Sequence, residues 1–228
     1  MKKLYMPLCL LLLASCASDK ETRSHSIEEI DKMVPCDTSE IENFHQYILY
    51  YMVEEDIENV WAAYTGESLD KFWNGPIARF STMYNPKNNV IFHAGDSDIP
   101  EASAGQKLSL NLLIEGYIRI PVYFQIQRVD SELKVIEFVY MEQNKSHGKQ
   151  LISFFPETIE GENFTLIRHQ SWYQSDSAVR DSLFYSDYHT QAVDEFHLSV
   201  AGSKEYSIKP VTEKYLIRRG LFISLEER

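Results

Sequence analysis

The chain has 228 residues, of which 22 are Lys or Arg and 34 are Asp or Glu, giving a formal net charge of −12 at pH 7. This acidic balance argues against nucleic acid as a partner, because phosphates bind basic patches, and against electrostatic attraction to anionic lipid. Hydrophobic residues make up 44% of the chain, which is enough for one sizeable core, so we expect a single main domain.

The first sixteen residues have the order of a cleavable export signal. Lys2 and Lys3 precede an apolar run of about ten residues, where a spanning helix needs about twenty, so the run is removed rather than kept as an anchor. The run ends in Leu-Ala-Ser-Cys at Cys16, which resembles the lipobox of bacterial lipoproteins. That resemblance implies a signal peptide at residues 1–15, lipid on Cys16 and a lipid-anchored place in the cell envelope, with the outer membrane favoured and either the periplasm or the cell surface as the side. The alternative is an ordinary secreted protein, because Ala-Ser also suits an ordinary signal peptidase.

The use of cysteine leaves no disulfide within the mature chain. Cys9 departs with the signal and Cys16 carries lipid, so Cys36 is the remaining thiol. Residues 16–41 are rich in Ser, Thr, Asp, Glu and Lys, which predicts a lipidated polar tether. A capping-box pattern at residues 26–29 predicts one short helix inside this tether. We expect Cys36 to be a linker cysteine without a role, and pairing between two molecules stays open.

A strand and two helices are predicted next. Residues 44–53 are dense in Tyr, Ile, Leu and Val, as is typical of a strand. Asp56 is a good N-cap for a helix with apolar residues at i, i+3, i+4 and i+7, and Gly66 is placed to close it. Ser68 is expected to cap a second short helix, which Asn-Gly-Pro then ends at residues 74–76.

Strand patterns dominate the following hundred residues or so. Turn residues at 85–89 predict a hairpin between the first two strands. Apolar and polar residues alternate over 106–129, which indicates strands with one buried face. The chain then continues as an antiparallel meander, and the predicted strands are 77–84, 90–94, 107–114, 118–126, 133–141, 149–155 and 164–173.

The last predicted element is a long helix. Caps at residues 175–177 open a helical stretch that runs to about residue 199, with an apolar stripe that includes Val193 and Phe196. Residues 203–228 show no clear pattern, and we interpret them as a C-terminal extension that is irregular or forms a strand.

The order strand, two small helices, six antiparallel strands and long helix resembles the helix-grip fold of the START-like, or SRPBCC, superfamily over residues 42–202. The stretch 57–64 directly after the first strand and the strands around Gly148 and Gly161 add to the likeness. The resemblance implies an α+β fold in which a curved antiparallel sheet wraps the C-terminal helix. It also implies a cavity between sheet and helix that commonly holds greasy molecules, although some relatives are cyclases, aromatases or hydrolases.

Alternation along the strands names the side chains that would line such a cavity. Most are apolar, with a few polar groups, which is the usual form of a small-molecule site. Helix residues are expected to add polar contacts. The predicted ligand-binding residues are Phe124, Phe138, Tyr140, Gln150, Ile152, Phe154, His169, Tyr173, Tyr185 and His189. Each also has a simpler interpretation, because buried His, Gln and Tyr are more often core groups with satisfied hydrogen bonds.

The predicted function is a membrane-anchored domain that binds an apolar or amphipathic small molecule, with no cofactor, no metal and no nucleic acid. No nucleophile elbow, glycine-rich phosphate loop or zinc motif occurs in the sequence, so a non-catalytic role is favoured over an enzyme. Two alternatives stay open. One is a cyclase-like or hydrolase-like enzyme that uses the same cavity, with Tyr140, Gln150 and His169 as acid and base groups. The other is a docking lipoprotein that binds a protein of the envelope.

Overall fold

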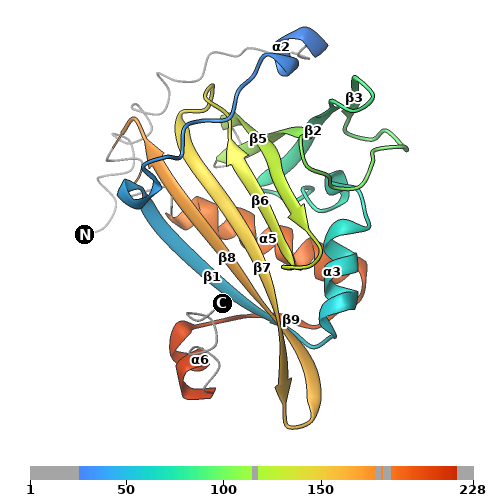
Figure 1. The fold of residues 1–228 in the computed structure, drawn as a ribbon, viewed down its shortest axis with the longest axis vertical. Coiled ribbons are helices and arrows are strands. Elements are labelled where there is room, and N and C mark those ends of the chain that lie inside the picture. Colours follow the sequence, from blue (N-terminus) through green and yellow to red (C-terminus); the bar gives the residue numbers. More distant parts are fainter. Residues whose placement is uncertain (1–25, 115–117, 178–180, 182–185, 220–228) are drawn as a thin grey trace, which may run out of the picture.

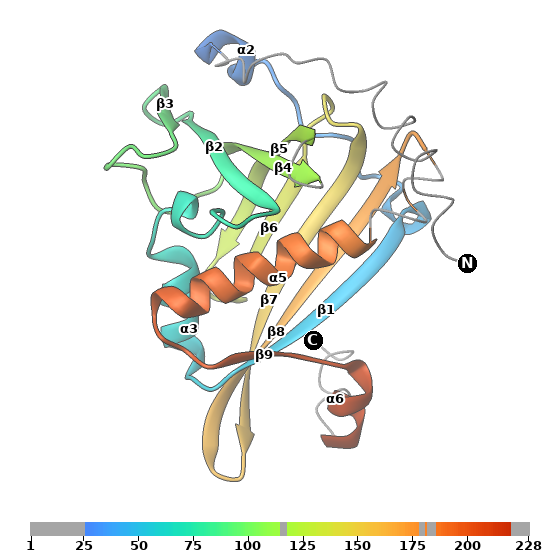
Figure 2. The ribbon, with the colours of Figure 1, turned by 180° about the vertical axis from the view of Figure 1, so that it is seen from behind.

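One nine-stranded antiparallel sheet carries the fold, in the order β3-β2-β4-β5-β6-β7-β8-β1-β9. The computed structural model describes residues 26–114, 118–177, 181 and 186–219. A long helix, α5, crosses the concave face of the sheet (Figures 1 and 2), which confirms the predicted helix-grip class. The strands are β1 (His45–Val53), β2 (Ala78–Asn85), β3 (Val90–His93), β4 (Lys107–Ile114), β5 (Ile118–Asp130), β6 (Val135–Tyr140), β7 (Ser146–Ile159), β8 (Glu162–Ser175) and β9 (Ile208–Val211).

Tight turns connect consecutive strands of the meander. Asn89, Lys134 and Glu160 adopt positive φ between consecutive strands, and Gly161 follows Glu160 at φ 93°, as the predicted turn at this glycine requires. Gly148 serves a different purpose, because a Cβ there would collide with the Trp172 carbonyl of β8. The close pairing of β7 with β8 at this point therefore depends on glycine.

The first helix forms where the sequence predicts it, and the second does not. Helix α3 spans Ile57–Thr65, the Asp56 side chain accepts a hydrogen bond from Glu58 N, and Gly66 closes the helix. The predicted second helix is only the 3₁₀ turn η2 (Leu69–Lys71), because Ser68 makes no side-chain cap hydrogen bond and Asn-Gly-Pro follows within three residues. The seven strands predicted for the following part of the chain are present as β2 to β8, one more than the six of the helix-grip order, and they lead to the long helix.

Helix α5 (Ser186–Ser203) is held against the sheet by a buried apolar stripe of Val193, Phe196 and Val200. The described helix runs four residues beyond the predicted end, and the predicted start near residue 177 borders residues that lie outside the described ranges. At that point Ser177 N donates to Ser175 Oγ, and Asp181 N donates to the Ser177 carbonyl, as in the first turn of a helix. None of the helices within the described ranges is long and apolar enough to cross a membrane.

The C-terminal extension completes the sheet. Strand β9 pairs antiparallel with β1, and helix α6 (Glu213–Arg219) follows it. Leu216 of α6 is buried on the convex face, where it joins the cluster of Met52, Phe155 and Leu166. The strand option for this extension is therefore correct, although four residues that include Pro210 are too few to show alternation.

The N-terminal segment also packs on the convex face. Helix α2 (Ile27–Asp31) has the predicted capping box between Ser26 and Glu29. Ile30, Met33 and Cys36 are buried, the first two in a cluster with Tyr84 and Met141. Residues 26–36, which we call the strap, therefore differ from the polar tether that composition predicts, because three apolar side chains at a spacing of three residues are enough to dock the segment on the sheet. Cys36 is likewise a buried thiol rather than a linker residue.

Candidate functional site

Strand register lines up polar side chains on the concave face. Gln150 of β7 lies opposite Ser171 of β8, and Ser171 lies opposite Tyr47 of β1. Two residues along, Ile152 lies opposite His169. Because side chains alternate between the two faces of a strand, these residues all point toward α5.

The structure places the predicted ligand-binding residues of the strands together in the concave face. All of them are buried, namely Phe124, Phe138, Tyr140, Gln150, Ile152, Phe154, His169 and Tyr173. His189 reaches the same region from the beginning of α5 and is partly buried. Tyr185 and Cys16 lie outside the described residues.

The last strand had competing faces in the sequence, and the structure resolves them. Leu166 and Phe164 point to the convex face, where they pack with α6. Trp172 lies under the Lys149 ammonium, also away from the helix. His169 and Ser171 are therefore free to face α5.

A chain of hydrogen bonds runs through this interior. Tyr64 Oη lies 2.6 Å from His197 Nδ1, and His197 Nε2 lies 2.9 Å from His169 Nδ1. His169 Nε2 lies 3.2 Å from Gln150 Oε1, and Gln150 Nε2 donates to Tyr140 Oη at 3.0 Å. We call these five residues the polar relay.

The relay joins one more histidine at the start of α5. His189 Nε2 lies 3.3 Å from Gln150 Nε2 and 3.1 Å from Ser171 Oγ. On the same part of the helix, Thr190 Oγ1 donates to Tyr47 Oη at 3.0 Å. The first turns of α5 are thus held to β1, β7 and β8 by hydrogen bonds between side chains.

The direction of each hydrogen bond in the relay follows from Gln150. Its Oε1 can only accept, so His169 donates from Nε2 and accepts at Nδ1. His197 must then donate from Nε2 and accept from the Tyr64 hydroxyl at Nδ1. Both histidines are neutral in this arrangement. A proton added to His169 Nδ1 would face the N–H donor of His197, and one added to His197 Nδ1 would require the Tyr64 hydroxyl to turn and accept.

Burial favours the same neutral state. Desolvation lowers the pKa of His197 to about 3 and that of His189 to about 4. The pKa of His169 falls well below its ordinary value, through burial first and then through the neighbouring histidines. Burial also raises the pKa of the Tyr64 hydroxyl. The relay therefore offers neutral hydrogen-bonding groups at physiological pH.

The two ends of the interior differ in packing. At the end near α3, Phe196 stacks on Trp73 with ring centroids 4.6 Å apart, and Tyr64 meets Phe154 edge-on at 4.9 Å. At the other end, Leu112, Ile120 and Val122 of the β4–β5 hairpin lie on the concave face but are only partly buried. We call the second region the open end, because α5 and its neighbours leave these apolar side chains partly exposed.

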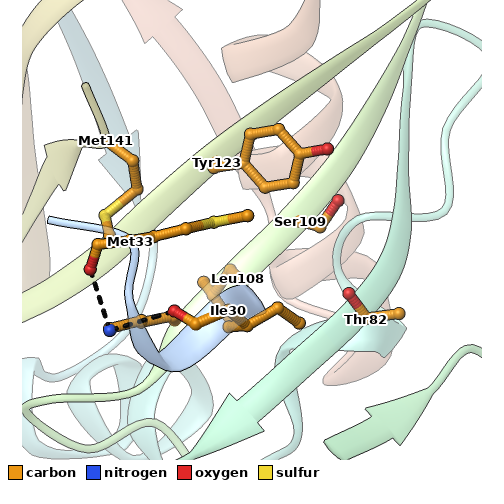
Figure 3. A pocket seen from close by; sticks show the side chains of 8 residues that line it. Ile30, Met33, Thr82, Leu108, Ser109, Tyr123 and Met141 are labelled. Carbon is orange, nitrogen blue, oxygen red and sulfur yellow. Dashed lines mark hydrogen bonds between the residues drawn. The ribbon is translucent and has the colours of Figure 1, made fainter. Parts of the chain in front are cut away.

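A small hollow lies on the convex side of the sheet, among residues that the structure describes. Its volume is about 10 Å³, which is room for about one water molecule. Figure 3 shows it beneath the strap, between Ile30, Met33 and strand residues that include Ser109 and Tyr123. Among the residues that the structure describes, no group of three or more His, Cys, Asp or Glu side chains could hold a metal ion.

Sequence reasoning missed two members of the relay. His197 was not named, although it follows His189 by eight residues and Val193 by four, so helical spacing places all three on one face. Tyr64 was assigned to the core of the first helix, and the structure adds a hydrogen bond to that role. Helical periodicity could have found His197, whereas the partner of Tyr64 depends on the tertiary contact between α3 and α5.

No family model matches the chain, and no curated protein matches it. A START superfamily protein from Mycobacterium smegmatis is 13% identical, with 71% of this chain and 97% of that protein covered and a TM-score of 0.47. The fold itself is the helix-grip arrangement of one curved antiparallel sheet around a long helix. A norcoclaurine synthase point mutant from Thalictrum flavum, in complex with a transition state analogue, is 12% identical over 71% of this chain and 98% of its own, with a TM-score of 0.45. A protein from Nitrosospira multiformis is 10% identical over 69% and 94%, with a TM-score of 0.45. Likenesses at this level concern the fold alone, and the fold class stands on the strand order and the long helix.

Proposed function

We propose that the chain is a lipid-anchored protein of the cell envelope whose START-like domain binds an apolar or amphipathic small molecule without transforming it. The ligand would lie between the open end of the sheet and the first turns of α5. Lipid on Cys16 would hold the domain to the membrane.

The observation that carries this proposal is the meeting of partly exposed apolar side chains with buried neutral polar groups at the open end. Leu112 and Val122 supply the apolar surface, and Tyr140, Gln150 and His189 supply donors and acceptors. An apolar lining with a few polar groups that fix orientation is the usual composition of a small-molecule site. Such a composition suits the greasy body and the polar end of one amphipathic molecule.

The inward side chains of the strands are buried beneath α5, so access for the ligand would come from movement of that helix. Movement of the first turns of α5 away from the sheet would break the hydrogen bonds Thr190–Tyr47 and His189–Ser171. The deep end, where Phe196 stacks on Trp73, would keep the helix attached. The apparent affinity is then reduced by the small fraction of molecules in the opened state.

Native mass spectrometry of protein purified from its own host tests the binding site. We expect a co-purifying hydrophobic molecule that is lost in Phe124→Trp, where the larger ring fills the interior beside Tyr140. Leu133→Trp is the matched control, because Leu133 is exposed in the turn between β5 and β6. Loss of the ligand in both variants, or in neither, would contradict the proposed position.

The anchor has a separate test. Cys16→Ser removes the sulfur that would carry lipid, so the variant should appear as precursor or as soluble protein instead of partitioning into detergent. The native chain should partition into the detergent phase. Equal partitioning of both forms would contradict the anchor and leave the binding site untouched.

A docking role is the second candidate, and the burial of the inward strand residues favours it. If the host-purified protein carries no ligand and Phe124→Trp is clearly less stable than the native chain, the interior is packed at ordinary density and the sheet serves as a scaffold. Envelope proteins that co-purify with the native chain would then be the partners to identify.

A further inference from the structure

One ammonium group makes three of the hydrogen bonds that hold the strap to the sheet. Lys107 Nζ, at the start of β4, donates to the carbonyl oxygens of Ile30 at 3.1 Å, Asp31 at 2.7 Å and Met33 at 2.9 Å. Three acceptors use all three donors of the ammonium. Burial around this site lowers the pKa of Lys107, and the nearby Asp31 opposes that shift.

Beyond these hydrogen bonds, the strap is joined to the strand ends that carry the candidate site. Glu142 N donates to the Val34 carbonyl at 3.0 Å, and Cys36 N donates to the Tyr140 carbonyl at 2.8 Å. Gly148 N donates to Cys36 Sγ at 3.2 Å. The strap therefore runs along the same end of the sheet as Tyr140 of the polar relay.

The length of the link between Cys16 and the strap, compared with the length of the sheet, limits which end of the sheet can lie near the membrane. Ten residues link Cys16 to Ser26, and ten residues of any chain span at most roughly 35 Å. Strand β7 runs from the strap end to the distal β7–β8 turn over 14 residues, which is about 45 Å. Figure 1 shows α2 and this turn at opposite ends of the molecule.

We infer that the strap holds the open end of the candidate site toward the lipid surface and the β7–β8 turn away from it. The partner is an uncharged or zwitterionic bilayer, because a chain with a net charge of −12 is repelled by anionic lipid. This inference rests on the lipid anchor of the proposed function. It places the entrance for an amphipathic ligand next to the membrane.

Energy transfer to the bilayer tests the orientation in the lipidated full-length protein. Donor dyes are attached to Gln143→Cys, which is exposed at the strap end, or to Thr158→Cys, which is exposed near the distal turn. The acceptor is a dye on lipid head groups of zwitterionic phosphatidylcholine vesicles. We expect transfer from position 143 to be several times more efficient than from position 158. Native protein, in which Cys36 is buried, gives the labelling background.

Two variants test whether the strap causes the difference in transfer efficiency between positions 143 and 158. Lys107→Met removes all three hydrogen bonds and should bring the two transfer efficiencies closer together by freeing the strap as additional tether. Twenty Gly and Ser residues inserted between Asp19 and Lys20 should do the same with the strap still docked. Lys209→Met, on the exposed β9, is the control and should leave the native difference unchanged.

The outcomes separate this inference from the proposed function. Equal transfer from positions 143 and 158 on protein that sediments with vesicles overturns the orientation and leaves the anchor standing. A difference that persists in both the Lys107→Met and the lengthened protein overturns the role of the strap. Protein that fails to sediment with vesicles overturns the anchor, and the orientation with it.

Discussion

The deep end and the open end of the concave face hold the same helix in different ways. At the deep end, Phe196 is buried against Trp73 and Tyr64, so α5 is attached by aromatic packing. At the open end, Thr190 and His189 attach the helix through hydrogen bonds between side chains. Burial of an aromatic ring contributes several kcal/mol, whereas one hydrogen bond contributes about 1 kcal/mol net. The comparison indicates that α5 can loosen at its beginning while its end stays in place.

The largest effect is expected at the deep end. Phe196→Ala leaves a cavity among aromatic rings and should lower the free energy of unfolding by about 3–5 kcal/mol. Urea unfolding followed by tryptophan fluorescence measures this change. Leu198→Ala, two residues along the helix and 53% exposed, is the control and should change stability by less than about 0.5 kcal/mol. A small effect of Phe196→Ala would show that the helix is not held here.

The polar relay lies between the two ends and should rank second. Gln150→Leu removes the acceptor of His169 and the donor to Tyr140, so the buried His169 N–H loses its partner. We expect a loss of about 1–3 kcal/mol in urea unfolding. Gln127→Leu, at an exposed position of β5, serves as the control and should be close to neutral. If Gln150→Leu is as stable as native protein, the relay contributes nothing to holding the helix.

Acid should weaken the relay through the histidines. His197 has a folded pKa of about 3 and an unfolded pKa of about 6.5, so the unfolded chain binds more protons between these values. Stability is therefore fully present above about pH 6.5 and is lost as the pH falls toward the folded pKa, by up to about 1.4 kcal/mol per pH unit for each such histidine. Unfolding measured across this range in native protein and in His197→Gln should give a shallower slope for the variant. Equal slopes would contradict a neutral buried His197.

The smallest change concerns the open end alone. Tyr47→Phe removes the hydroxyl that accepts from Thr190 and should cost about 1 kcal/mol or less in global stability. Its main effect should be faster amide hydrogen exchange in residues 187–192, with no change around Phe196. Tyr206→Phe is the control, since Tyr206 follows the end of α5. Faster exchange along the whole helix would contradict a difference between its two ends.

Local patterns account for what could be predicted from the sequence. Alternation over β4 and β5 and the capping signals at Asp56 and Ser26 are properties of neighbouring residues, and the structure has these elements in place. The end of α5 was predicted less well, because the helix continues to Ser203, four residues beyond the apolar stripe that marked it. The predicted start near residue 177 borders residues outside the described ranges.

The rest depended on contacts between distant residues. The strap looked like a tether because its composition is polar, and only the sheet supplies Tyr84 and Met141 to cover Ile30 and Met33. Strand β9 exists because β1 offers an open edge to it. For the candidate site, the inward side chains followed from alternation, but the order of hydrogen bonds from Tyr64 to Gln150 required the helix to be placed on the sheet.

The docked strap also implies an order of steps while the chain is made and folds. Its partners come much later in the chain, since Lys107 lies 77 residues after Ile30 and Gly148 lies 112 residues after Cys36. The strap leaves the ribosome before these partners and therefore cannot dock until β4 to β7 have paired. Under the lipid anchor proposed above, lipid would be attached to Cys16 and the signal cut before the strap docks. Docking of the strap is accordingly a late step of folding, after which the Cys36 thiol is buried.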